Sequence, residues 1–288
     1  ADGSVLLTGG KAIKNVTGYN LTSLFTGSEG TLGIITRALL RLIPMPKKRG
    51  TLQLMFRSLD DGCTTIHQIL QAGLLPAAAE IMDRFCLEAV ARHRKTDLDP
   101  AIGCCIIVEI DGEDDAALDN QARRMEEVAK RCGVYQFRIA QSQQESDELW
   151  AIRRGLSSAI ASLVPNRLGE DISVPRDAFP EVVRRISAIA EKHRLTIAVY
   201  GHAGDGNIHP SVLCDLSKPG EEERVHRAVE EIFDAALAVG GTLSGEHGIG
   251  ITKRPYIAKA LGESGVRALG AIKQALDPKG ILNPGKIW

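Results

Sequence analysis

The sequence predicts an α+β fold in which a sheet is covered by helices on one side. Between residues 51 and 140, short apolar runs that read as strands alternate with amphipathic segments that read as helices. Repeated strand–helix alternation of this kind is typical of such a sheet. Two polar clusters follow short apolar segments further along the chain. Site residues are often held in this way, so we expect both clusters at an edge of the sheet.

Apolar periodicity and helix start and stop residues define the expected elements. The expected strands are 5–7, 34–43, 51–56, 77–82, 106–110, 134–140 and 196–200. The expected helices are 60–71, 83–94, 115–131, 143–162, 179–193 and 221–239. Asp60 is the expected N-cap of the first helix, and Gly73 its stop. Pro44 and Pro46 end the second strand, and a domain boundary is expected there.

The helices are justified by the face that each presents. In 115–131, Leu118, Ala122 and Met125 share one face of an otherwise charged segment, which Gly133 stops. In 179–193 the inward residues include Val182, Val183 and Ile186, and 221–239 repeats this pattern before Gly240 and Gly241. The patterns therefore predict helices that bury one stripe and expose the rest.

Composition excludes several classes of function. The chain has 288 residues and a formal net charge of −1, so there is no general electrostatic attraction to nucleic acid. No apolar run reaches the ~18 residues that a membrane span needs, and no signal peptide is visible. Without a Cys-x-x-Cys pair, the six cysteines indicate buried thiols in a reducing compartment, here the cytoplasm. They are Cys63, Cys86, Cys104, Cys105, Cys132 and Cys214.

The two polar clusters carry the chemistry. The first runs from Gly201 to His209 as Gly-His-Ala-Gly-Asp-Gly-Asn-Ile-His, and the second from Ser244 to Gly250 as Ser-Gly-Glu-His-Gly-Ile-Gly. A single histidine is more often an ordinary surface or core residue. Three histidines with acidic side chains among glycines favour a site instead. Such side chains bind a divalent metal, and the histidine left over can move a proton.

Four stretches in the same order give the chain a family resemblance. They are residues 14–21 running on to 27–33, residues 150–154 (Trp-Ala-Ile-Arg-Arg), the two polar clusters, and residues 277–286. On these residues the chain resembles the flavin-linked oxidases and dehydrogenases of the vanillyl-alcohol-oxidase type. Within that family it is most similar to the flavoprotein subunit of glycolate oxidase and to D-lactate dehydrogenases.

The resemblance implies a domain plan. Residues 1–48 correspond to the C-terminal part of an FAD-binding domain, and residues 49–270 to a substrate or cap domain with a ferredoxin-like antiparallel sheet and flanking helices. Residues 271–288 would return to the flavin site. In the family, an N-terminal flavin-binding region with a glycine-rich pyrophosphate loop comes first. We therefore expect the chain to be a C-terminal portion that holds FAD poorly or not at all and is inactive alone.

The resemblance also implies a metal and a substrate site. His202, His209 and Glu246 would bind a divalent metal, for which Zn²⁺ fits best and Mn²⁺ or Fe²⁺ are alternatives. His247 would be the catalytic base, and Asp205 would orient one of the ligand histidines. The substrate carboxylate would bind two residues of the 143–162 helix. These are Arg153 and, one turn later, Ser157.

The resemblance implies that two segments of the chain contact the flavin. Small residues permit close approach to FAD, and consecutive backbone N–H groups can bind its phosphates. The segment Gly27–Thr31 would lie along FAD, and the C-terminal segment would return near its ring. The cofactor-binding candidates are Gly27, Ser28, Glu29, Gly30, Thr31, Asn283 and Lys286.

The implied function is FAD-dependent oxidation of a small 2-hydroxy acid, with glycolate giving glyoxylate. A metal would assist deprotonation of the hydroxyl, and a hydride would pass to the flavin. D-lactate oxidation is the alternative within the family. A non-catalytic metal-binding or assembly module that lacks the flavin half is the alternative of another class. Electrons would pass to partner subunits with iron–sulfur clusters, to quinone or to oxygen. We expect the protein in the cytoplasm, where its partner subunits would attach it to the inner membrane.

Overall fold

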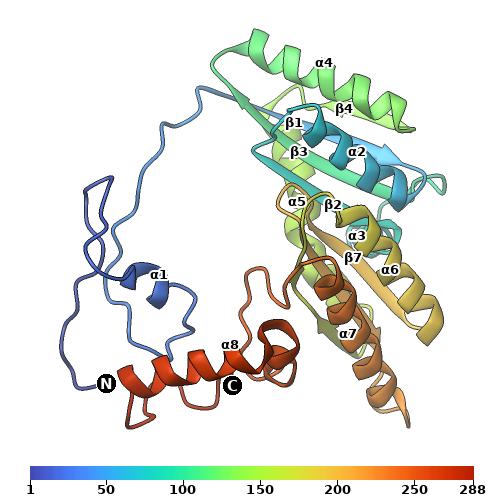
Figure 1. Cartoon of the computed structure of the whole chain (residues 1–288). Coiled ribbons are helices and arrows are strands. Elements are labelled where there is room, and N and C mark those ends of the chain that lie inside the picture. Colours follow the sequence, from blue (N-terminus) through green and yellow to red (C-terminus); the bar gives the residue numbers. More distant parts are fainter. The chain divides into compact units, whose positions relative to one another are not determined.

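The computed structural model describes residues 1–288, which divide into two compact units (Figure 1). One unit comprises residues 45–245, and the other comprises residues 1–44 together with 246–288. Each unit is described by itself.

Residues 45–245 build one antiparallel sheet. Its strand order is β4-β1-β3-β2-β7-β8-β5, and β6 also pairs with β8. The strands are β1 (Lys48–Phe56), β2 (Ala78–Asp83), β3 (Cys104–Gly112), β4 (Gln136–Ile139), β5 (Asn166–Gly169), β6 (Ile172–Ser173), β7 (Thr196–His202) and β8 (Asn207–Cys214). The α+β class with an antiparallel sheet and flanking helices is therefore confirmed. However, the first polar cluster lies on two interior strands, because β5 extends the sheet beyond β8.

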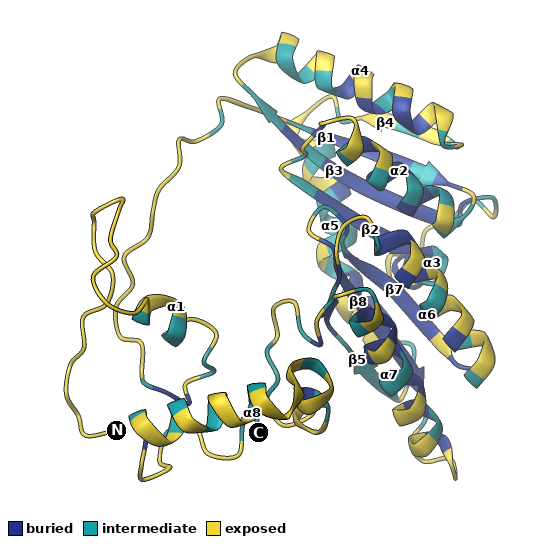
Figure 2. Ribbon diagram, viewed as in Figure 1, coloured by how far each residue is buried: buried dark blue, intermediate teal, exposed yellow.

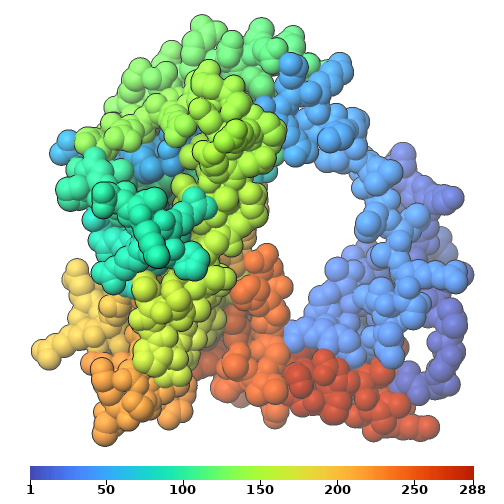
Figure 3. Space-filling view, turned by 180° about the vertical axis from the view of Figure 1, so that it is seen from behind, coloured from blue at the N-terminus to red at the C-terminus, as the bar shows by residue number.

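Helices cover both faces of this sheet, and the one-sided arrangement predicted from the alternation is wrong. The helices are α2 (Leu59–Gln71), α3 (Arg84–Arg94), α4 (Asp115–Arg131), α5 (Gln143–Ala161), α6 (Phe179–His193) and α7 (Glu221–Ala238). Successive residues of β3 show the two sides: Ile106 lies against α2, whereas Ile107 packs with α3 and α5. In Figure 3, which shows the molecule from behind, α5 lies across the face of the sheet opposite α2.

The central strands of the sheet are buried on both faces (Figure 2). Residues 104–108 of β3 are all fully buried, which accounts for the unbroken apolar run Cys-Cys-Ile-Ile-Val. Five of the six free cysteines are buried, and Cys132 is partly buried. Burial raises the pKa of the Cys105 thiol to about 12, which keeps it protonated and inert. The cysteines are thus part of the core.

The predicted bounds hold best for amphipathic helices. The helices 115–131 and 179–193 are confirmed as α4 and α6. The N-cap of α2 is Ser58 and not Asp60, because the Ser58 hydroxyl accepts the N–H of Asp61. Asp60 instead pairs with Arg184 of α6. The strands β5, β6 and β8 were not predicted, since they are short or carry polar residues that read as loop.

The other unit holds α1 (Leu21–Phe25), a 3₁₀ turn (Arg254–Tyr256) and α8 (Ile257–Leu276), the last kinked at Gly262. The strands expected at 5–7 and 34–43 are not present. Ile34, Leu40 and Ile43 are 75–80% exposed, and no strand pairs with either segment. An apolar run becomes a strand only where a partner takes up its backbone hydrogen bonds.

Lys273 and Asp277 tie three segments of this unit together. The Lys273 ammonium donates to the Asp277 carboxylate at 2.6 Å and to the carbonyls of Thr31 and Leu282, each at 2.7 Å. Asp277 also accepts the backbone N–H of Leu282 at 2.8 Å. Burial acts to raise the pKa of Asp277, but Lys273 and the backbone donors lower it to about 2.

None of the helices combines the length and the apolar character that a membrane span requires.

We expect Asp277→Asn to lower the free energy of unfolding of this unit at pH 7. The folded-state pKa lies below the ordinary value, so the stabilisation is present above about pH 4 and is lost as pH falls through 2. Urea unfolding of wild type and variant from pH 7 to pH 2 measures the difference, which should shrink in acid. Asp119→Asn, on the exposed side of α4, is the control. A difference that stays constant down to pH 2 would contradict this assignment.

Candidate metal centre

The hairpin of β7 and β8 presents two of the predicted metal ligands on one face of the sheet. Tyr200 lies opposite His209 in the register, and His202 lies opposite Asn207. Directly opposite residues share a face, so both histidines point the same way. Their ring centroids are 5.2 Å apart with the rings edge to face. The connecting turn needs Gly206, which has φ +80° and whose added Cβ would lie 2.2 Å from the Val174 carbonyl oxygen.

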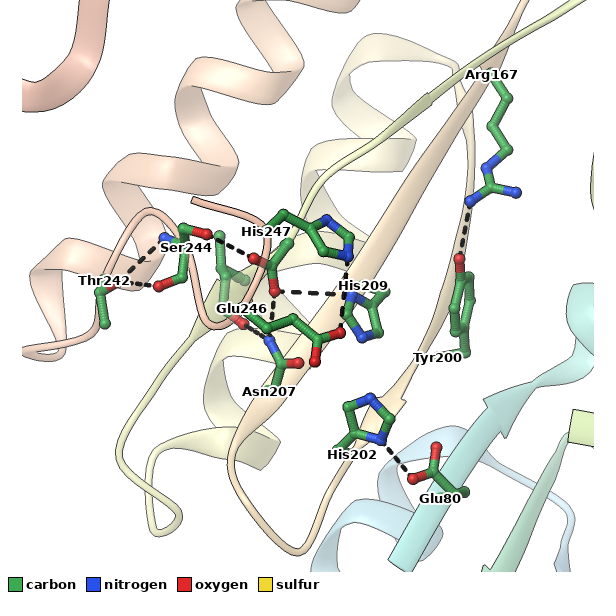
Figure 4. Close-up of polar contacts among 12 residues, drawn as sticks. Glu80, Arg167, Tyr200, His202, Asn207, His209, Thr242, Ser244, Glu246 and His247 are labelled. Atoms are coloured by element: carbon green, nitrogen blue, oxygen red, sulfur yellow. Dashed lines mark hydrogen bonds and ion pairs between the residues drawn. The ribbon is translucent and has the colours of Figure 1, made fainter. Parts of the chain in front are cut away.

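A buried glutamate holds the first histidine. Glu80 of β2 lies opposite His202 in the register of β2 and β7. The Nδ1 atom of His202 is hydrogen bonded to Oε1 of Glu80 (Figure 4). The other oxygen, Oε2, accepts from Nε of Arg153 at 2.6 Å. Arg153 reaches it because α5 packs on this face of the sheet.

Glu80 is 6% exposed, yet it is held in its ionised form. Burial acts to raise its pKa, but the hydrogen bond from His202 and the positive charge of Arg153 together bring the pKa below its ordinary value. An ionised carboxylate only accepts hydrogen bonds. The Nδ1 atom of His202 therefore carries the proton in this contact, and the lone pair of the ring is on Nε2.

A second buried carboxylate lies beside the other histidine. Asp171 is 0% exposed, and its Oδ1 lies 3.8 Å from Nδ1 of His209. Asn207 donates to the same oxygen at 2.7 Å, and Ser244 donates its hydroxyl to Oδ2 at 2.7 Å. Each candidate ligand imidazole thus has a buried carboxylate near Nδ1.

The chain between β8 and the second polar cluster returns to the sheet and is held there. The N–H of Thr242 donates to the carbonyl of Ser173 at 2.7 Å, and Ser244 binds Asp171. Gly245 follows so closely that an added Cβ would lie 2.3 Å from Nδ2 of Asn207. The path of the chain is therefore fixed up to the residue that precedes Glu246.

Glu246 and His247 belong to the other unit. Oε1 of Glu246 lies 3.7 Å from Nε2 of His247, and both side chains are more than half exposed. Beyond them, the Glu29 carboxylate accepts the N–H groups of Ile249 and Gly250 at 2.7 and 2.8 Å. The segment that carries both residues is thus anchored within its own unit.

The carboxylate-binding candidates lie on α5. Ser157 is exposed, and its hydroxyl accepts from Nη1 of Arg167 at 2.8 Å. Nη2 of Arg167 donates to the hydroxyl of Tyr200 at 3.0 Å. The guanidinium carbon of Arg153 lies 5.2 Å from the centroid of the same tyrosine ring. Two guanidinium groups therefore gather around Tyr200.

The flavin candidates lie in the other unit. Gly27, Glu29 and Gly30 have φ between +53° and +78°, which makes a tight turn. Nδ2 of Asn283 donates to the Glu29 carbonyl at 2.6 Å. Lys286 is half-buried, next to Ile287, whose N–H donates to the Gly250 carbonyl at 3.0 Å. The structure thus joins the expected flavin segments, Gly27–Thr31 and 281–287, to the segment after His247.

The sequence reasoning missed the carboxylates at the two histidines. Asp205, the residue expected to orient one of them, is exposed in the turn and shows no contact with either ring. Glu80 and Asp171 occupy those places instead. Glu80 could have been noticed as a lone charge within the apolar run 77–82, because a buried charge needs a partner. No comparable signal marks Asp171.

We expect Asn207→Asp to destabilise the sheet unit by about 3 kcal/mol, because it removes two donors and sets a second carboxylate against Asp171. Urea unfolding at pH 7 measures this. Asn120→Asp, an exposed position on α4, is the matched control and should change stability by less than about 0.5 kcal/mol. Equal stability of both variants would show that the buried hydrogen bonds of Asn207 do not stabilise the sheet unit.

Comparison with known proteins agrees with the fold and with the sequence motifs. A model of the family "FAD linked oxidases, C-terminal domain" matches residues 45–287. The chain is 38% identical to the glycolate oxidase subunit GlcD of Bacillus subtilis, over 100% of the chain and 61% of that protein. It is 34% identical to a probable mitochondrial D-lactate dehydrogenase of Danio rerio, over 100% of the chain and 58% of the relative.

A crystal structure of p-cresol methylhydroxylase shares the fold, with a TM-score of 0.70 at 17% identity, and covers 94% of this chain and 58% of that one. The chain spans less than two thirds of the length of these relatives. Because the family match extends over most of the chain, the chain belongs to the FAD linked oxidases, as their C-terminal domain.

Proposed function

We propose that this chain supplies the metal- and substrate-binding part of an FAD-dependent enzyme that oxidises glycolate to glyoxylate. The observation that carries the proposal is the pair of imidazoles, His202 and His209, with buried carboxylates near their Nδ1 atoms and the Arg153 guanidinium held beside one of them. The similar protein of Bacillus subtilis is named as a glycolate oxidase subunit. In this proposal, residues 1–48 and 271–288 face the flavin, and residues 49–270 form the substrate domain.

A divalent metal fits the donor set. Two imidazole nitrogens and one carboxylate, from His202, His209 and Glu246, form a group that could hold a metal ion. Chain geometry supports the choice of Glu246. Gly245 is packed against Asn207, the residue opposite His202, and consecutive Cα atoms are about 3.8 Å apart. Zn²⁺ suits this mixture of ligands, and Mn²⁺ or Fe²⁺ are alternatives.

The remaining residues have roles that follow from their chemistry. The terminal nitrogens of Arg153 bind the substrate carboxylate through two parallel hydrogen bonds, and Ser157 adds a polar contact. His247, next to Glu246 in the chain, takes the proton of the substrate hydroxyl as general base. A bound metal would supply a lower pKa for that hydroxyl, and bound FAD would supply the acceptor for the hydride of C2. The side chain of Glu29 is already bound to backbone amides, so we assign FAD contact in Gly27–Thr31 to the backbone.

D-lactate is the second substrate candidate, because relatives named D-lactate dehydrogenase match over essentially the whole chain. A non-catalytic metal-binding module is the candidate of another class. For the electrons that leave the flavin, we propose partner subunits with iron–sulfur clusters, since the glycolate oxidase relatives are named as subunits. Quinone and oxygen are the alternatives. In this proposal the enzyme works in the cytoplasm and reaches the inner membrane through its partners.

We expect the full-length protein, with FAD bound, to be yellow and to bleach when glycolate is added without oxygen. Anaerobic absorbance with a panel of small 2-hydroxy acids measures the substrate, and metal analysis of the same sample measures the ion. Faster bleaching by D-lactate than by glycolate would choose the second candidate. A colourless protein with bound metal would favour the module, and a yellow protein that no 2-hydroxy acid bleaches would refute the oxidase.

We expect His247→Ala to slow flavin reduction by about 10²- to 10⁴-fold, because it removes the general base, while the metal content stays near that of wild type. His209→Ala should lower both the rate of flavin reduction and the metal content, because it removes a metal ligand. Anaerobic stopped-flow absorbance and metal analysis give the two values. His226→Ala, on the exposed side of α7, is the control. Loss of metal in the His247 variant would show that it is a ligand and not the base.

A further inference from the structure

We propose that Glu80 is a positioning residue that couples the metal ligand His202 to the substrate-binding Arg153. One buried carboxylate holds both groups: it fixes the proton of His202 on Nδ1, so that Nε2 carries the lone pair, and it fixes the guanidinium of Arg153. The part that concerns metal and substrate rests on the function proposed above. The part that concerns the histidine proton rests on the contacts of Glu80 with His202 and Arg153.

The geometry is that of a bridge. Oε1 of Glu80 contacts Nδ1 of His202, and Oε2 contacts Nε of Arg153 at 2.6 Å. The side chain of Glu80 is 8% exposed and that of Arg153 is 17% exposed, so water screens these contacts little. With one partner on each oxygen, the carboxylate cannot rotate without breaking a charge-assisted hydrogen bond.

The bridge decides which imidazole nitrogen is available. The ion pair with Arg153 keeps Glu80 ionised, and an ionised carboxylate has no proton to donate. His202 must then donate from Nδ1, which puts the lone pair of the ring on Nε2. Carboxylates in this position orient metal-binding histidines and raise their basicity. Glu80 therefore selects both the tautomer and the direction of the His202 ring.

The bridge also fixes Arg153. Its contact with Glu80 uses Nε, which leaves the two terminal nitrogens for a substrate carboxylate. The ring of Tyr200 lies 5.2 Å from the guanidinium carbon and limits its movement on a second side. A guanidinium held in this way loses less conformational entropy when it binds a carboxylate. Glu80 thereby sets the separation between the metal ligand and the group that binds substrate.

A merely structural ion pair is the competing explanation. A buried pair can often be replaced by apolar residues without loss of stability, and breaking it by removing one partner destabilises the fold. Such a role predicts a change in unfolding free energy alone. The coupling role predicts in addition a change of tautomer, of metal affinity and of KM in variants that remain folded.

The test uses two variants and one control in the full-length protein with FAD bound. Glu80→Gln keeps the shape and removes the charge, whereas Glu80→Asp keeps the charge and shortens the reach, which guards against misfolding of the first variant. Glu109→Gln is the control: Glu109 lies on neighbouring β3 and pairs only with exposed Arg49. Circular dichroism and urea unfolding identify the variants that fold.

Nitrogen NMR of the metal-free protein is the first readout. In wild type we expect His202 protonated on Nδ1, and in Glu80→Gln we expect both tautomers, because an amide can accept or donate. The second readout is Zn²⁺ affinity by chelator competition, which should fall 10- to 100-fold in Glu80→Gln and less in Glu80→Asp. The third is the KM for the 2-hydroxy acid, which should rise about tenfold, while Glu109→Gln changes none of these values.

The outcomes separate this inference from the proposed function. Wild-type protein that bleaches with substrate, together with folded Glu80 variants of unchanged Zn²⁺ affinity and KM, would overturn the coupling and leave the function intact. Wild-type protein that binds no Zn²⁺ would overturn the metal proposal. The nitrogen NMR spectrum then tests the remaining part of the inference, that the proton of His202 is on Nδ1. A wild-type His202 protonated on Nε2 would overturn the inference in either case.

Discussion

The register of three antiparallel strands determines which side chains meet in the candidate centre. Glu80 of β2 lies opposite His202 of β7, and His202 lies opposite Asn207 of β8, so one row across the sheet carries an acid, a base and an amide. A shift of one residue in either pairing would send one of these groups to the other face of the sheet, among the apolar side chains that pack on α2 and α6. The turn at Gly206 and the apolar residues of both faces therefore maintain the centre as well as the fold.

Buried charge is the second constraint. Two of the buried carboxylates of the sheet unit, Glu80 and Asp171, lie at the candidate centre, where an unpaired charge would cost several kcal/mol. Each is compensated by groups that are themselves part of the centre: an arginine and a histidine for Glu80, an asparagine and a serine for Asp171. The two networks hold different parts of the chain. That of Glu80 joins the sheet to α5, and that of Asp171 joins β8 to the chain at Ser244.

The sequence predicted the parts of this molecule that depend on local pattern. The helices 115–131 and 179–193 emerge with their predicted bounds because each has an apolar stripe and clear ends. The α+β class followed from the alternation of apolar runs and amphipathic segments, and the family from motifs whose order is itself informative. Residues 34–43 failed as a strand because a strand depends on a partner, which an apolar run cannot specify. Glu80 and Asp171 were missed for a related reason: their importance comes from what lies across the sheet, 122 residues away for Glu80 and His202.

The segment that carries Glu246 and His247 depends on both units. On one side, Ser244 is bound to Asp171 and Gly245 is packed against Asn207, within the sheet unit. On the other side, Ile249 and Gly250 donate to the Glu29 carboxylate, within the second unit. Only residues 246–248 lie between these anchors, and Gly248 has the left-handed φ of +82° that a close turn requires. The two side chains to which we assign the third metal ligand and the base are therefore carried by a segment of three residues that is held at both ends, by Ser244 and Gly245 before it and by Ile249 and Gly250 after it.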